Sequence, residues 1–263
     1  MKYLLKTALL ASLGAAMATQ TARAQNTYAN EDLLLGFELT GQSHDVVFDL
    51  GNIAIFSSGT SSFDLSTDGY SASLVETEFG VTSMAGVEWF VAGDDAAGDT
   101  VYATKARGSG TLGTQSIPFN NTSSSSLGAT SGKIDSLGEG SGGYSSNASG
   151  NSFLSPDATA INSANANSVT KIQGTVGKFG GTFQGSTLNL APAGGVSISD
   201  LYDVQATDLG APSGGAGSFG YFTLNSANGD MTFVAPEPSA YSFAACAGLV
   251  LFLFRNQFRR QAA

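Results

Sequence analysis

The sequence predicts a mainly β protein: an antiparallel β-sandwich or barrel-like body with one or two short helices, an N-terminal signal peptide and a C-terminal transmembrane helix. Three observations lead to this prediction. Short apolar runs alternate with turn residues, the 263 residues include 34 glycines and 34 serines, and an apolar run stands near each end. Apolar residues make up 42% of the chain, which is enough to build a core and argues against intrinsic disorder.

The N-terminus has the layout of a secretory signal peptide over residues 1–24. Lys2 and Lys6 precede a short apolar run, and Ala22 and Ala24 supply the small side chains that signal peptidase requires. Cleavage after Ala24 would make Gln25 the first mature residue. A buried N-terminal helix is the weaker alternative.

The body, residues 25–234, contains three candidate hairpins in which two strand-like runs flank a turn. Their strands are expected at 33–39 with 45–50, 87–91 with 100–104, and 220–224 with 231–234. In the third hairpin, Asn228-Gly229 is suited to the positive φ of a tight turn. Further strands are expected at 170–176, 181–184 and 199–205.

Two short helices are expected in the body. Ser73 and Glu76 form a capping-box pattern, and Gly80 is a suitable residue to end that helix. Ser155-Pro156-Asp157 predicts a second helix that runs to about Asn165. Between these elements, residues 106–152 are rich in glycine and serine without a visible period, which predicts a flexible insertion or irregular loops.

The C-terminus carries an extended segment, an apolar run and a basic cluster in that order. Pro236-Glu237-Pro238 disfavours helix, and an apolar transmembrane run follows over 240–254. This run is shorter than the ~20 residues of a full span. The basic cluster of Arg255, Arg259 and Arg260 would hold that end on the cytoplasmic side. A buried core helix is the alternative that the length alone favours.

Residues 235–262 resemble the PEP-CTERM protein-sorting signal of diderm bacteria. The resemblance implies that exosortase, a membrane-embedded enzyme, recognises Pro236, Glu237 and Pro238 and removes the anchor. Proteins with this signal are linked to exopolysaccharide and biofilm matrix. The short apolar run and the interruption of the basic cluster by Asn256-Gln257-Phe258 depart from the family pattern.

Charge and rare residues exclude several classes of function. The whole chain has a net charge of −10, and the five basic residues within 25–238 face 21 acids, which gives that part −16. Without clustered Lys and Arg, nucleic-acid binding is not expected. The chain has one histidine and one cysteine, so multi-ligand zinc sites and a disulfide framework are not expected. Cys246 lies in the apolar run, where a small helix residue is the simplest interpretation and lipidation a minor alternative.

No catalytic motif emerges. His44 stands beside Ser43 and Asp45, but a catalytic triad is assembled across a fold and not from neighbours, so His44 is interpreted as a polar turn residue. Gly-x-Gly-x-x-Gly occurs from Gly108, Gly138 and Gly215, without the strand and helix that a dinucleotide site needs.

Two groups of acidic residues are interpreted as solvated loops, with structural calcium as the weaker alternative. They are Asp94, Asp95 and Asp99, and Asp64 with Asp68. No other cofactor is expected.

The sequence therefore predicts an exported, non-enzymatic protein of the cell envelope or extracellular matrix, structural or adhesive in role. Its expected partners are signal peptidase, exosortase, the membrane and extracellular polysaccharide. Two alternatives stay open. A carbohydrate-binding module would use surface aromatics, for which Trp89, Tyr102 and Tyr221 are candidates, and a polysaccharide-active enzyme would use carboxylates across a cleft.

Overall fold

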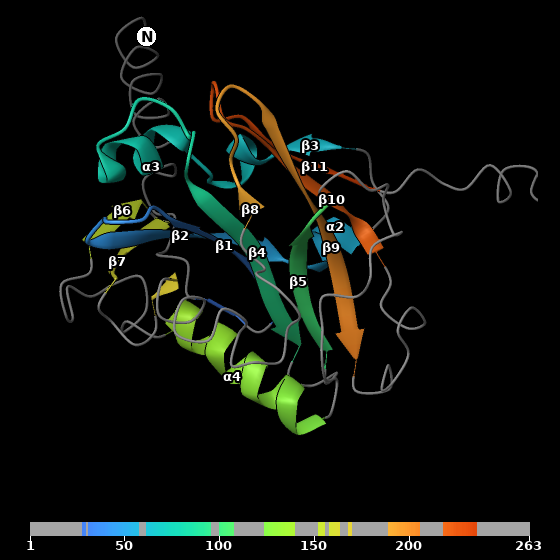
Figure 1. Ribbon diagram of the computed structural model, residues 1–263. Helices are drawn as coiled ribbons and strands as arrows, with labels where there is room; N and C mark the ends of the chain where they lie inside the picture. Colours follow the sequence, from blue (N-terminus) through green and yellow to red (C-terminus); the bar gives the residue numbers. More distant parts are fainter. Residues whose placement is uncertain are drawn as a thin grey trace, which may run out of the picture.

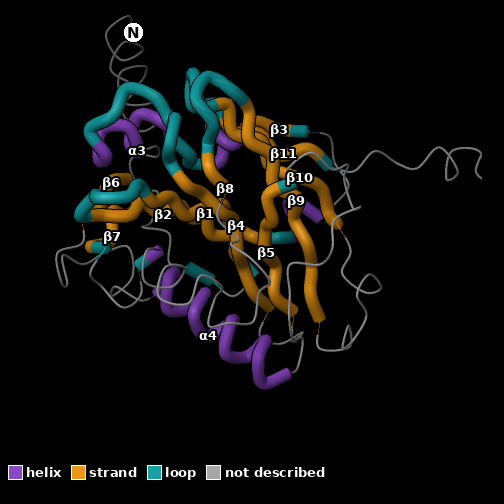
Figure 2. The backbone as a smooth tube through the Cα atoms, in the orientation of Figure 1, coloured by secondary structure: helices purple, strands orange, loops and turns teal. Residues whose placement is uncertain are grey.

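The chain forms a mainly β structure built on one curled antiparallel sheet, a half-barrel in outline (Figures 1 and 2). The computed structural model describes residues 28–29, 31–57, 62–95, 100–107, 124–139, 152–155, 158–163, 168–169, 189–205 and 218–235. The predicted signal peptide, the Pro236–Pro238 box, the apolar run and the arginine cluster lie outside these residues. Within the described part, no helix is long and apolar enough to cross a bilayer.

Ten strands follow one another across the sheet in the order β3-β11-β10-β9-β5-β4-β1-β2-β7-β6, and β8 pairs with β4. Four helical segments accompany the described strands. The strands are β1 (Asp32–Glu38), β2 (His44–Asn52), β3 (Phe63–Asp64), β4 (Glu88–Asp95), β5 (Thr100–Ala106), β6 (Ser152–Ser155), β7 (Ala158–Asn162), β8 (Asn189–Leu190), β9 (Val196–Gln205), β10 (Ser218–Asn225) and β11 (Met231–Val234). The helical segments are α2 (Ala54–Ser57), η1 (Leu65–Asp68), α3 (Ala72–Phe79) and α4 (Ser124–Glu139).

The three predicted hairpins are confirmed. β1 pairs with β2, β4 with β5, and β10 with β11, each in antiparallel register. The β10–β11 turn places Gly229 at φ 74°, as the Asn228-Gly229 pair predicted. The strand expected at 199–205 is also found, as part of β9. The strands expected at 170–176 and 181–184 lie outside the described residues.

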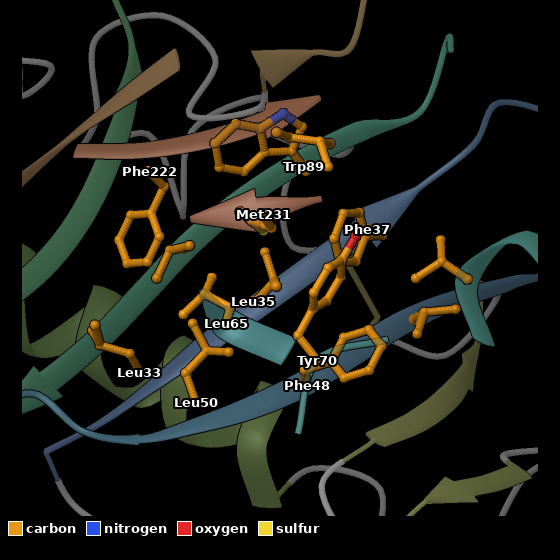
Figure 3. Packing of buried hydrophobic residues seen from close by; sticks show 14 of the residues in the cluster. Leu33, Leu35, Phe37, Phe48, Leu50, Leu65, Tyr70, Trp89, Phe222 and Met231 are labelled. Atoms are coloured by element: carbon orange, nitrogen blue, oxygen red, sulfur yellow. The ribbon is translucent and has the colours of Figure 1, made fainter. Parts of the chain in front are cut away.

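The inside of the curl is filled by one apolar group, called here the inner cluster. Leu33, Leu35 and Phe37 of β1 point into it, and it extends to β10 and β11 at the other end of the sheet (Figure 3). The short helical segments close the curl, because α2 contacts both β2 and β10 and η1 contacts both β2 and β11. Phe37, Phe48 and Tyr70 meet with ring centroids 5.4 to 5.9 Å apart.

The opposite side of β1 and β4 carries a second apolar group, called here the outer cluster. Leu34 alternates with its neighbours on β1 and joins Phe90 on this side. Burial on both faces explains why β1 reads as a continuous apolar run and not as an alternating one. Helix α4 lies across β4 and β5 and covers the cluster with Leu127, Ile134 and Leu137 (Figure 1).

Two predictions were wrong. Within residues 106–152, which were expected to be a flexible insertion or irregular loops, the structure forms α4 over Ser124–Glu139. Only three large apolar side chains mark its buried side, so the sequence shows little amphipathic pattern. The helix expected from Ser155 to about Asn165 is replaced by β7 at Ala158–Asn162, which pairs with β2 and is buried on both faces. Tertiary pairing there overrides the local capping signal.

The helix expected near residues 73–80 is present as α3, with one difference. Gly80 ends it with φ 66°, as predicted. Its N-cap is Ser71 and not Ser73, and the Ser71 side chain makes no capping hydrogen bond to the helix. Instead the Ser71 and Ser73 hydroxyls bond to each other at 2.9 Å.

Candidate functional site

The sorting residues predicted from the sequence border the folded body. β11 ends at Val234, two positions before Pro236, and Ala235 still packs against the inner cluster. At the other end, Tyr28 is buried and its hydroxyl donates to Asp94 Oδ1 at 2.7 Å. The described fold thus begins three positions after Gln25 and ends next to the Pro-Glu-Pro box. The predicted site residues themselves lie outside the described residues: Ala22, Ala24, Gln25, Pro236, Glu237, Pro238, Arg255, Arg259 and Arg260.

The aromatic candidates for sugar stacking do not form one platform. Trp89 is fully buried, and its indole Nε1 donates to Ser197 Oγ at 2.9 Å, so it belongs to the core. The ring of Tyr221 is half-buried and lies under the Arg107 guanidinium, with 4.1 Å between the guanidinium carbon and the ring centroid. Burial raises the pKa of the half-buried Tyr102, and nearby Asp95 and Asp203 add to the effect.

A buried ion pair that the sequence did not reveal joins β5 to β9. Arg107 Nε donates to Asp200 Oδ1 at 2.7 Å, and Nη2 lies 2.5 Å from the same oxygen. Asp200 is fully buried, while the Arg107 side chain is 12% exposed. Because the guanidinium also stacks on Tyr221, it ties three neighbouring strands together: β5, β9 and β10. Two residues 93 positions apart give no sequence signal for such a pair.

Tyr202, beside this pair on β9, carries a buried hydroxyl that has no hydrogen-bond partner among the described residues. Burial raises its pKa to about 12, the Asp200 carboxylate adds to the rise, and Arg107 opposes it. The phenol is therefore neutral over the whole physiological range. A buried hydroxyl without a partner costs stability, which makes Tyr202 a strained point of the outer side of the sheet.

One residue of each acidic group has a structural role, and the interpretation of Asp94 as part of a solvated loop is wrong, because Asp94 belongs to β4. Asp94 is fully buried and accepts from the hydroxyls of Tyr28 and Ser131. Asp64 caps η1 by accepting from the Ser66 backbone N–H at 2.8 Å. Asp99 lies outside the described residues. Among the described residues, no three His, Cys, Asp or Glu side chains gather as a metal site would require.

His44 does not belong to a catalytic relay. Its Nδ1 lies 3.0 Å from Ser43 Oγ and 3.4 Å from Glu78 Oε1 of α3. A relay needs the nucleophile on one ring nitrogen and the acid on the other, whereas both groups here approach the same nitrogen. The contact instead connects the start of β2 to α3.

The Gly-x-Gly-x-x-Gly matches provide no nucleotide loop in the described residues. Gly138 lies at the end of α4 instead of between a strand and a helix start. A side chain there would overlap the ring of Tyr28, so packing requires the glycine. Gly108 and Gly215 lie outside the described residues.

Asp32 and Glu31 form a strained corner that the sequence did not point to. Glu31 adopts φ 76°, and its backbone carbonyl accepts from the Ile53 N–H at 2.7 Å. Burial raises the pKa of the neighbouring Asp32, although its carboxylate accepts from the Ala29 N–H at 2.8 Å. The Glu31 N–H donates to the Asp94 carbonyl at 2.9 Å, and this bond holds the start of β1 against β4.

Comparison with known proteins adds no relative: no protein-family model matches the chain, and neither a curated protein nor a solved structure does so.

Proposed function

We propose that this chain is an exported protein of the cell envelope or extracellular matrix that exosortase sorts through its C-terminal Pro-Glu-Pro signal. The observation that carries the proposal is the order of the last 30 residues. A folded body ends at β11, and the Pro236–Pro238 box, the apolar run 240–254 and the arginine cluster follow directly. This is the order in which a processing enzyme would need to meet an accessible box and then a membrane anchor.

The body has the properties of a scaffold. Several polar groups of the described residues bind one another: Arg107 binds Asp200, His44 contacts Glu78, and Asp94 binds Tyr28 and Ser131. Groups used in this way stabilise a fold and are not poised for chemistry. The net charge of −16 over residues 25–238 favours solubility outside the cell and discourages binding to anionic surfaces. These properties and the resemblance of the C-terminus to a sorting signal support a structural or adhesive role in an exopolysaccharide matrix.

The sorting role is tested in cells that contain exosortase. We expect replacement of Pro236, Glu237 and Pro238 by alanine to leave a full-length form in the membrane fraction, while the wild-type body is shortened and released. Asn228→Ala, in the exposed β10–β11 turn, is the control and should be processed normally. Immunoblots of membrane and medium fractions measure the outcome. Equal processing of the triple variant and the wild type would exclude this role for the box.

The role of the body is tested separately with the processed protein. We expect it to co-fractionate with extracellular polysaccharide, and deletion of the protein to loosen the matrix under shear. Shortening of the polysaccharide by the purified body would contradict a non-enzymatic role.

A further inference from the structure

Three segments far apart in sequence meet at the carboxylate of Asp94, at the end of β4. The Tyr28 hydroxyl donates to Oδ1 at 2.7 Å, and the Ser131 hydroxyl of α4 donates to Oδ2. Asp94 is fully buried, so each hydrogen bond also satisfies a carboxylate that water does not reach. The ring of Tyr28 lies against Gly138 at the end of the same helix. Tyr28 is thus connected to α4 both through the shared carboxylate and through direct packing.

Helix α4 depends on these contacts because its own sequence favours helix weakly. Nine of its 16 residues are Ser, Thr or Gly, and its buried side has only Leu127, Ile134 and Leu137 as large apolar groups. Packing does not explain two of the glycines, since a Cβ at Gly128 or Gly132 would meet no atom within 4 Å. Each glycine in a helix costs roughly 1 kcal/mol relative to alanine. An isolated helix of this composition would not be stable in water.

We propose that α4 is a strap that can open and close over the outer cluster. The Asp94 carboxylate couples the closing of α4 on the sheet to the binding of Tyr28 at the same carboxylate. When Tyr28 is in place, both carboxylate oxygens of Asp94 accept a hydrogen bond and α4 lies closed on β4 and β5. When Tyr28 leaves, α4 loses its packing at Gly138 and opens without unfolding the sheet. Opening would expose Phe90, Val101 and their apolar neighbours on that side. The inference does not depend on how the chain is sorted.

Hydrogen exchange of the mature chain tests the coupling. We expect Tyr28→Phe to raise the exchange rate of the α4 amides roughly tenfold, which corresponds to about 1.4 kcal/mol. Tyr28→Ala, which also removes the ring, should raise it further. In both variants the β1 and β2 amides should keep their rates. Tyr70→Phe is the matched control, since the Tyr70 hydroxyl also donates a buried bond, to the Gly229 carbonyl at 2.8 Å, but on the other side of the sheet.

The reverse direction tests the same coupling, because linkage between two sites is reciprocal. Ser131→Ala should speed chymotrypsin cleavage after Tyr28. Ser136→Ala should not, since that hydroxyl donates within α4 itself, to the Gly132 carbonyl at 2.6 Å. The inference is overturned if α4 exchanges at the wild-type rate in Tyr28→Ala, or if α4 and the central strands speed up together. It is also overturned if Ser131→Ala leaves the cleavage rate unchanged.

Discussion

The two faces of the sheet are covered by different kinds of side chains. The inner cluster joins both ends of the curled sheet and contains eight buried aromatic side chains, six of them phenylalanines, among the described residues. The outer cluster is mostly aliphatic, and a helix rich in serine and glycine covers it. Polar contacts accompany the outer face: the Asp94 carboxylate holds α4, and the Arg107–Asp200 pair lies beside Tyr202.

This difference indicates a division of stability between the faces. The inner cluster buries large rings from strands that are distant in sequence, so it stabilises the sheet as a whole. On the outer face, α4 packs through only three large apolar side chains, Leu127, Ile134 and Leu137, and its other contacts each involve one carboxylate or one ring. Regions with few buried apolar contacts open at lower free energy than the core. The following changes test that contrast, beginning with the largest expected effect.

Phe233→Ala should destabilise the whole domain by about 3–5 kcal/mol, since it leaves a cavity where Phe56, Phe63 and Phe222 now meet the ring at 5.0 to 5.6 Å. Urea unfolding followed by Trp89 fluorescence measures the loss. Leu137→Ala on α4 is the counterpart and should change the exchange of α4 while leaving the urea midpoint of the sheet nearly unaltered. Equal midpoint shifts in the two variants would mean that both faces unfold as one unit.

Arg107→Met should cost about 3–5 kcal/mol, because it leaves the buried Asp200 carboxylate without its counter-charge. We expect the double change Arg107→Met with Asp200→Asn to recover most of this loss. Both are measured as free energies of unfolding in urea. A double variant as unstable as the single one would show that the guanidinium acts mainly by stacking on Tyr221.

Gly128→Ala with Gly132→Ala should strengthen α4 by up to about 2 kcal/mol, since both positions are open to a methyl group. The α4 amides should then exchange more slowly. Gly138→Ala is the contrasting variant and should speed their exchange, because its methyl group would overlap the Tyr28 ring. If all three alanines act alike, helix propensity and not the Tyr28 contact controls this face.

Tyr202→Phe should stabilise the domain by about 1 kcal/mol, because it removes a buried hydroxyl that has no partner in the described part of the chain. The pH dependence of the free energy of unfolding also has a definite sign. Since the fold raises the pKa of Tyr202 from 10 to about 12, the neutral phenol is favoured and stability is lost as the pH rises through that interval. Phenolate absorbance and unfolding at alkaline pH should both lose this step in the variant. Retention of the step would assign it to another tyrosine.

Local elements of this protein were predictable from its sequence where neighbouring residues determine them. The hairpins β1–β2, β4–β5 and β10–β11 each join adjacent apolar runs, and Gly80 and Gly229 stand where a positive φ is needed. The order of the hairpins in the sheet was not predictable, because pairing of β5 with β9 or of β11 with β3 joins residues far apart in the chain. The strand β7 was also not predicted, because it is buried on both faces and follows Ser155-Pro156-Asp157, a pattern that favours a helix start.

In the candidate site too, features set by neighbouring residues were predictable and contacts between distant residues were not. The sequence by itself determined that residues 25–234 contain no cysteine, and it supplied the order of short motifs on which the proposed export and sorting signals rest. Only the tertiary structure decided that Arg107 meets Asp200, that Trp89 is a core residue and that Tyr28 and α4 share Asp94. Each of those contacts is specific because burial removes water as a competitor, and burial is set by the packing of distant segments.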